Sequence, residues 1–211
     1  MCSKQLCLDS FPSENEKYDI ILADPPWGYR KNRNKPSNRY REIPYDTLST
    51  KKLKGIPVSR IAAEDCVLLL WVTGPYMMEA NEVIKSWGFR FSTVFLVWRK
   101  TYKNAGTPVY SFGSHTRHCH EYLLMASRGS NMKFRSQDKS VSQLLETISL
   151  VSARREHSRK PDEVLSIVER VFLSSARKIE LFARRTRAQW DAWGLEVPGF
   201  YKKCISEQTQ Q

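Results

Sequence analysis

The segment Asp24-Pro25-Pro26-Trp27 contains the residues best suited to chemistry in this 211-residue chain. It places a carboxylate, a proline-stiffened backbone carbonyl and an aromatic face side by side. An adenine amine is a poor nucleophile because its lone pair is delocalised, so an enzyme must accept its hydrogen bonds and align it with a methyl donor. Asp24 and the Pro25 carbonyl can accept those bonds, and Trp27 can stack on an extruded base. A plain proline-rich turn is the simpler alternative.

The elements that must position this segment are short apolar strands and two helices. Residues 18–23 form an apolar run that ends at the rigid Asp24-Pro25 turn, as a buried strand does. Further interior strands are predicted at Cys66–Val72, Phe91–Trp98, Glu121–Ala126, Ile148–Ser152 and Lys178–Phe182. Helices are predicted at Pro75–Trp87 and Pro161–Leu173, which open with proline and repeat apolar residues at helical spacing. The alternation predicts an α/β fold with a doubly wound, mostly parallel sheet, whose ligands bind beyond the carboxyl ends of the strands.

Length and composition favour one domain over residues 1–205, followed by a polar, disordered tail at 206–211. No apolar run is long enough to cross a bilayer, and we expect a protein without a membrane partner. The five cysteines are scattered without a CxxC pair, so reduced thiols are expected. The expected location is the cytoplasm of a prokaryotic or phage host cell, or the nucleus if the source is eukaryotic.

The positive charge is concentrated in particular segments of the chain. Its formal net charge is +12, and residues 28–60 alone carry ten basic against two acidic side chains. Such clustering fits a polyanionic partner, because each neutralised phosphate releases counterions. A solubilising basic surface is the alternative. The polar, basic residues 28–46 are long for a connection, which favours a functional loop. Its candidate substrate contacts are Arg30, Lys31, Arg33 and Arg39.

With its DPPW segment, the chain resembles the nucleic-acid adenine methyltransferases related to the 70-kilodalton mRNA methyltransferase subunit, often called MTA-70. The resemblance covers nearly the whole chain and includes the intact DPPW segment. It continues, in family order, through PYDTLS (44–49), LWVT (70–73), WGF (87–89), WRK (98–100), REHSRKPDE (155–163) and KIELFAR (178–184). It implies a Rossmann-like methyltransferase fold with permuted motif order, and S-adenosyl-L-methionine as the cofactor. The permutation accounts for the lack of a GxGxxG loop after an early strand.

The resemblance also implies roles for individual residues. Asp24 belongs to both the catalytic and the cofactor site, and Lys100 is similar to the cation that meets the methionine carboxylate. The implied cofactor residues near the last predicted strand are Glu180, Phe182, Arg184, Arg187 and Glu196. The implied substrate residues are Trp27, Tyr45, Arg159 and Lys160, of which Tyr45 is similar to a loop tyrosine beside the target base. For any one of these charges alone, a solvated or structurally paired group is the simpler explanation, whereas together with the DPPW segment they favour a site.

Two positions depart from the family pattern. Thr186-Arg187 stands where eukaryotic members have a His-Asn pair for the cofactor ribose, and Leu195 stands where many members have Asn. Leu195 cannot bind through its side chain, so Glu196 or the backbone would take that role.

The histidines and the cysteine of residues 115–120 do not favour a metal site, because no second ligand cluster accompanies them. Support of the active site by His120-Glu121 is preferred.

The sequence therefore predicts an S-adenosylmethionine-dependent adenine-N6 methyltransferase acting on nucleic acid. The compact form resembles prokaryotic or phage members, which favours DNA over RNA. The alternatives are a catalytically silent nucleic-acid-binding subunit of a methyltransferase complex, an RNA adenosine-N6 methyltransferase, and an enzyme acting on protein or a small molecule. A homodimer or heterodimer is compatible with the resemblance.

Overall fold

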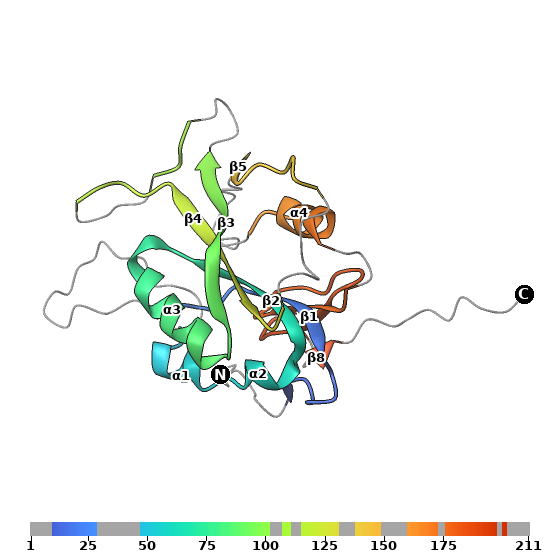
Figure 1. Cartoon of the computed structure of the whole chain (residues 1–211). Helices are drawn as coiled ribbons and strands as arrows, with labels where there is room; N and C mark the ends of the chain where they lie inside the picture. Colours follow the sequence, from blue (N-terminus) through green and yellow to red (C-terminus); the bar gives the residue numbers. More distant parts are fainter. Residues whose placement is uncertain are drawn as a thin grey trace, which may run out of the picture.

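A single eight-stranded sheet organises the computed structural model, with strand order β5-β3-β4-β2-β1-β6-β7-β8 (Figure 1). The structure describes residues 10–28, 47–101, 107–110, 115–130, 138–148, 160–172, 176–197 and 200–201. The strands are β1 (Tyr18–Ala23), β2 (Ala62–Val72), β3 (Arg90–Thr101), β4 (His120–Arg128), β5 (Leu144–Ile148), β6 (Lys178–Leu181), β7 (Asp191–Trp193) and β8 (Phe200–Tyr201). The helices are α1 (Thr50–Lys54), α2 (Val58–Ile61), α3 (Met77–Ser86) and α4 (Glu163–Val171).

The first strand of the chain lies in the interior of the sheet. β1 pairs in parallel with β2 on one side and with β6 on the other. β7 continues the parallel set beside β6. β4 runs antiparallel to both β2 and β3, and β8 runs antiparallel to β7. The predicted α/β sheet is therefore confirmed as mostly parallel, with the chain order of the strands permuted relative to their order in space.

Helices cover both faces of the sheet, as expected for a doubly wound fold. On one face α1, α2 and α3 bury Leu53, Ile61 and Val83 against the side chains of β1, β2 and β6 that point their way. On the other face α4 buries Val164 and Val168 against the alternate side chains of β1 and β2. Because both faces are covered, β1 and the second half of β2 are almost uniformly apolar.

Several element boundaries differ from those predicted. A strand was expected at Ile148–Ser152. β5 spans Leu144–Ile148, with Val97 of β3 paired to Leu144, and the remaining predicted residues, 149–152, lie outside the described part. The helix expected from Pro75 begins as a 3-10 turn at Gly74–Tyr76 before α3. Elements of two to five residues, namely α1, α2, β7 and β8, were not predicted because they are too short to show periodicity. None of the described helices is long and apolar enough to span a membrane.

Candidate active site

Two carboxylates meet at the carboxyl edge of the sheet because their strands are parallel neighbours. The register pairs Leu22 with Glu180 and Ala23 with Leu181, so Asp24 directly follows β1 beside the end of β6. The Asp24 backbone N–H points at the Leu181 carbonyl oxygen, 3.4 Å away. Parallel strands expose their carboxyl ends at one edge, where ligands of open α/β sheets bind. This edge is therefore the candidate active site.

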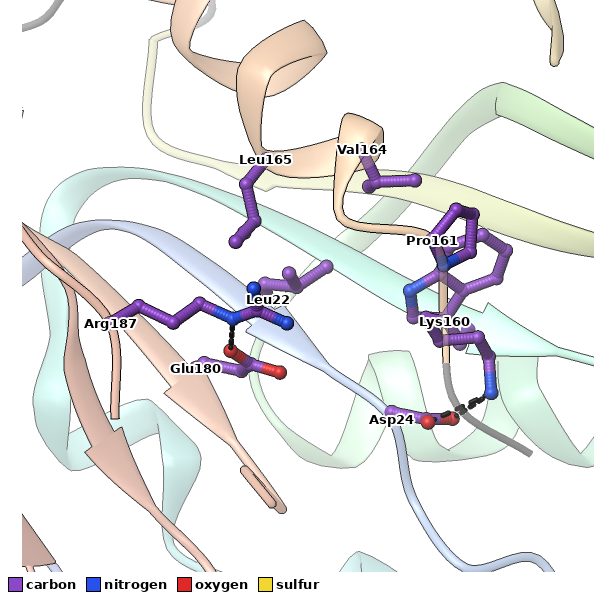
Figure 2. Close-up of a pocket in the computed structure, with 9 residues that line it drawn as sticks. Leu22, Asp24, Lys160, Pro161, Val164, Leu165, Glu180 and Arg187 are labelled. Atoms are coloured by element: carbon purple, nitrogen blue, oxygen red, sulfur yellow. Dashed lines mark hydrogen bonds and ion pairs between the residues drawn. The ribbon is translucent and has the colours of Figure 1, made fainter. Parts of the chain in front are cut away.

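The carboxylates line a narrow pocket roofed by the start of α4 (Figure 2). Its lining consists of Leu22, Asp24, Trp71, Lys160, Pro161, Val164, Leu165, Glu180 and Arg187. The free space between these side chains is about 20 Å3, room for about one water molecule. Charged groups occupy the floor and sides, and the aliphatic side chains of β1 and α4 form the remaining wall.

Asp24 is the first member of a chain of alternating charges. The Lys160 ammonium nitrogen lies 2.7 and 2.8 Å from the two carboxylate oxygens of Asp24 and 3.2 Å from Glu121 Oε2. The other oxygen of Glu121 accepts a hydrogen bond from Lys100. Lys160 also lies over the Trp71 ring and Lys100 over the Trp98 ring. The chain connects the end of β1 with β4 and β3, so Asp24 and Lys100 belong to one electrostatic unit.

Burial and these partners shift the pKa of each acid differently. Burial raises the pKa of Asp24 above its usual range, although Lys160 opposes the shift. Burial also acts to raise the pKa of Glu121, but Lys160 and Lys100 outweigh it and hold that pKa at about 2. Burial disfavours the Lys160 ammonium, yet Asp24 and Glu121 together raise its pKa above the usual value. Lys160 and Glu121 are thus charged at neutral pH, while Asp24 is a better proton acceptor than an ordinary aspartate.

A second group of charges holds Glu180 at the other side of the pocket. Arg187 donates from Nε to Glu180 Oε2 at 3.0 Å and from Nη1 to Asp162 Oδ1 at 2.7 Å. Burial raises the pKa of Glu180, while Arg187 acts to lower it. The arginine therefore ties β6 to the start of α4, and Figure 2 shows its side chain extending alongside Glu180.

The backbone of the DPPW segment is fixed by hydrogen bonds to residues that follow the basic loop. The Pro25 carbonyl accepts from the Trp27 N–H at 2.9 Å, and the Pro26 carbonyl accepts from the Leu48 N–H at 2.8 Å. The Gly28 N–H donates to the Leu48 carbonyl at 3.0 Å, which completes a short parallel bridge between Trp27 and Leu48. These bonds hold the turn after β1 in one conformation.

The Trp27 side chain is an anchor in the core. Only 9% of the residue is exposed, and its indole N–H donates to the Trp71 carbonyl oxygen at 2.9 Å. Its ring stacks on Tyr76 with centroids 5.7 Å apart, and the Tyr76 hydroxyl donates to the Gly28 carbonyl at 2.7 Å. In this structure the aromatic stacking partner of Trp27 is therefore Tyr76.

The fold and the carboxylate geometry agree with the relationship found by sequence comparison. The sequence model of the MT-A70 family matches residues 18–196. The chain belongs to the MT-A70 family. Membership places it among the methyltransferases, in agreement with a Rossmann-like fold.

Similar proteins come from bacteria, fungi and animals. The type II methyltransferase M.MunI of Mycoplasma sp is 35% identical, over 87% of this chain and 79% of its own. The N6-methyladenosine RNA methyltransferase MTA1 of Cryphonectria parasitica is 32% identical, over 91% of this chain and 55% of its own. The human N(6)-adenosine-methyltransferase catalytic subunit METTL3 is 28% identical, over 88% of this chain but 29% of its own.

The structure brings together part of the cofactor set predicted for this MT-A70 chain. Asp24, Glu180 and Arg187 line one pocket, and Lys100 is connected to them through Glu121 and Lys160. Three further predicted residues lie beyond the pocket lining, namely Phe182, Arg184 and Glu196. Arg184 Nε lies 3.7 Å from the exposed Glu196 carboxylate, and Phe182 packs its edge on Trp193 with φ at 62°. Their roles stay predictions.

The structure describes only some of the predicted substrate contacts. Lys160 is in the pocket, paired with Asp24. Six predicted substrate residues lie outside the described part of the chain, namely Tyr45, Arg30, Lys31, Arg33, Arg39 and Arg159.

Among the described residues, no group of three or more His, Cys, Asp or Glu side chains is placed to hold a metal ion. His120 bonds through Nε2 to the Tyr122 hydroxyl at 2.7 Å, while Glu121 joins the charge chain.

Two contributors to the MT-A70 site were not singled out from the sequence. Trp71 forms part of the pocket wall and supplies the carbonyl that fixes Trp27, and its presence in the LWVT segment was the available signal. Asp162 binds Arg187 and Arg185, although it precedes a helix and would be expected to cap it. Its pairing has no signal in the sequence, because its partners lie on a distant loop.

Proposed function

We propose that this MT-A70 chain methylates the exocyclic amine of adenine in nucleic acid, preferably DNA, with S-adenosyl-L-methionine as donor. One observation carries the proposal: the Asp24 and Glu180 carboxylates line the same pocket at the ends of neighbouring parallel strands. One acid is thereby available to a target amine, and the other to a donor bound beside it. Proximity of two bound reactants is a major source of rate acceleration.

Asp24 is the residue proposed to receive the target amine. Both oxygens are engaged by one ammonium group, so the site already accepts N–H bonds from a nitrogen. The amine of adenine would replace Lys160 at these oxygens. The Pro25 carbonyl, which accepts one bond from Trp27, keeps a second lone pair for the same amine. Methyl transfer makes the nitrogen cationic, and the raised pKa of Asp24 suits it to accept the proton that is then released.

The residues present fit the donor in chemical type. Glu180 can accept hydrogen bonds from two ribose hydroxyls, and Lys100 can meet a carboxylate. Leu22, Val164 and Leu165 offer apolar wall on the same pocket. When bound, S-adenosylmethionine supplies an electrophilic methyl group on a sulfonium. Because the free space is about 20 Å3, a nucleoside-sized ligand needs additional room, which separation of the Lys160–Asp24 pair would provide.

The preference for DNA rests on similarity. The chain is 35% identical to the Mycoplasma type II methyltransferase, against 32% and 28% for the fungal and human adenosine methyltransferases. Its net charge of +12 suits either nucleic acid. DNA is therefore proposed as the better substrate, and RNA is the alternative.

The test is transfer of a tritiated methyl group to matched single-stranded and double-stranded DNA and RNA. Asp24→Asn keeps the shape of the side chain but removes the proton acceptor, and should lower the rate at least about 100-fold. Glu163→Gln is the matched control, since Glu163 is exposed in the first turn of α4 and should retain full activity. Activity should also fall steeply with salt. Wild-type counts at the background level, no higher than those of Asp24→Asn on any substrate, would contradict the proposal and favour a catalytically silent subunit.

A further inference from the structure

Arg187 lies between two acids that come from different elements. It bonds to Glu180 at the end of β6 and to Asp162 at the start of α4, at 3.0 and 2.7 Å. The side chains of Arg187 and Glu180 are 18% and 17% exposed, so their bond is partly shielded from water, whereas Asp162 is 48% exposed. A guanidinium is planar and always charged, and it fixes the direction of the carboxylates that it binds. The arginine is therefore placed to orient both acids.

Asp162 binds Arg187 through its side chain and does not cap helix α4. It occupies the N-cap position of α4, where an aspartate usually accepts a backbone N–H of the first turn, but it makes no such bond. Its Oδ1 atom instead accepts from Arg185 and Arg187. The start of α4 is thus tied through Asp162 to the loop that follows β6.

The segment 160–162 is consequently tied at both ends above the pocket. At one end Lys160 binds Asp24, and at the other end Asp162 binds Arg187. Pro161 between them lines the pocket and stiffens the segment. Figure 2 shows Pro161 and Lys160 on one side of the pocket and the Arg187-Glu180 pair on the other.

We propose that Arg187 is a positioning residue of the cofactor site, which acts through Glu180 and Asp162 instead of contacting the cofactor. A carboxylate has about four acceptor positions, so Glu180 can bind Arg187 and still accept from ribose hydroxyls. Arg187 keeps Glu180 ionised and pointed into the pocket while it holds the segment 160–162 in place. The inference rests on the proposed function, since it assigns Glu180 to the cofactor.

The charge of Arg187 affects the pKa of Glu180, which a residue that only packs against it would not do. Burial raises the pKa of Glu180 and Asp24 adds to the rise, whereas Arg187 and, more weakly, Arg185 oppose it. Asp162 also faces Arg187 from α4. Without Arg187 the pKa of Glu180 rises further, so the carboxylate is protonated at a higher pH. A ligand that donates hydrogen bonds to the ionised form then loses affinity earlier as the pH falls.

Calorimetric titration with S-adenosylhomocysteine across a pH series tests the role without relying on turnover. Arg187→Ala should weaken binding about tenfold or more at neutral pH and should move the acid loss of affinity to higher pH. Arg187→Lys keeps the charge but cannot hold two carboxylates in one plane, so its affinity should fall while its pH profile stays close to wild type. Arg170→Ala is the matched control: Arg170 lies exposed in the last turn of α4 and pairs with Asp138 away from the pocket, so its removal should leave affinity near wild type.

A double-mutant cycle separates positioning from direct contact. If Arg187 acts through Glu180, then Arg187→Ala should weaken binding much less in a Glu180→Gln background than in wild type. Additive losses, or a pH profile unchanged by Arg187→Ala, would overturn the inference while leaving the proposed function intact. Failure of the wild-type protein to bind S-adenosylhomocysteine would instead overturn both. Thermal unfolding of each variant confirms that the measured protein is folded.

Discussion

The Lys160 ammonium nitrogen donates to both carboxylate oxygens of Asp24, at 2.7 and 2.8 Å. The same nitrogen lies 3.2 Å from Glu121. One cation therefore contacts two acids in a site where these side chains are largely shielded from water. Removal of that cation leaves Asp24 without this partner and Glu121 with Lys100 alone, which costs more than the loss of an exposed ion pair.

Lys160→Met should accordingly lower the free energy of unfolding by about 3 kcal/mol, because an unpaired charge remains in a partly buried site. Urea denaturation at neutral pH measures the effect. The double variant Lys160→Met/Asp24→Asn should be destabilised by less than the sum of the two single variants, since it carries neither charge of the Lys160–Asp24 pair. A Lys160→Met protein with the urea midpoint of wild type would show that the ion pairs carry no net stability.

Glu121→Gln should remove a contribution to the free energy of unfolding that depends on pH in the acid range. Lys160 and Lys100 outweigh the effect of burial and hold the pKa of Glu121 at about 2, below its ordinary 4.5. A depressed carboxyl pKa adds stability that is fully present above the unfolded value and is lost as pH falls toward the folded value. The difference in unfolding free energy between wild type and Glu121→Gln should therefore shrink between pH 4.5 and pH 2. A constant difference over that interval would contradict the assignment.

Tyr76→Phe should weaken the turn that follows the catalytic segment. The change keeps the ring that stacks on Trp27 but removes the hydroxyl that donates to the Gly28 carbonyl at 2.7 Å. The expected loss is about 1 kcal/mol of stability, together with slower methyl transfer and unchanged affinity for S-adenosylhomocysteine. Tyr110→Phe, at an exposed position, is the control. Equal transfer rates for the two variants would disprove the coupling between Tyr76 and the site.

Gly194→Ala should disturb the strand pair that carries Glu180. A Cβ at this position would lie 2.6 Å from the Ala183 backbone nitrogen and closer still to the Ala183 carbonyl oxygen. Backbone atoms cannot move aside as a flexible side chain can, so we expect a loss of about 2 kcal/mol or more and weaker cofactor binding. Gly74→Ala is the matched control, because no atom lies within 4 Å of its added Cβ. Thermal unfolding of the two variants side by side checks the difference.

The family resemblance assigned Asp24 and Glu180 to one site, but the sequence did not show what binds them. Apolar runs mark buried strands, and parallel strands bring their carboxyl ends to one edge, so Asp24, directly after such a run, was predicted at a ligand-binding edge. The contact of Lys160 with Asp24 joins residues 136 positions apart, and no local pattern reports it. Arg187 was predicted as a cofactor residue from its place in the family order, whereas its bonds to Glu180 and Asp162 depend on how a loop folds back.

Strand direction was also only partly predictable. The apolar run of β4 looks like those of its neighbours, because a strand buried on both faces has the same composition in either orientation. Its antiparallel pairing with β2 and β3 brings Glu121, at the start of β4, to the same edge as the ends of the parallel strands. Glu121 therefore reaches Lys100 and Lys160 because β4 runs backwards through the sheet.

The interior position of β1 has a consequence for how the protein is made. Its neighbour β6 is formed by residues 178–181, so the strand that carries the catalytic acid is synthesised long before one of its two partners. Until those residues emerge, an almost wholly apolar strand has an unpaired edge, which invites association with other chains. Chains cut short before residue 178 would thus combine two defects: they lack the pocket, and they expose a surface prone to aggregation.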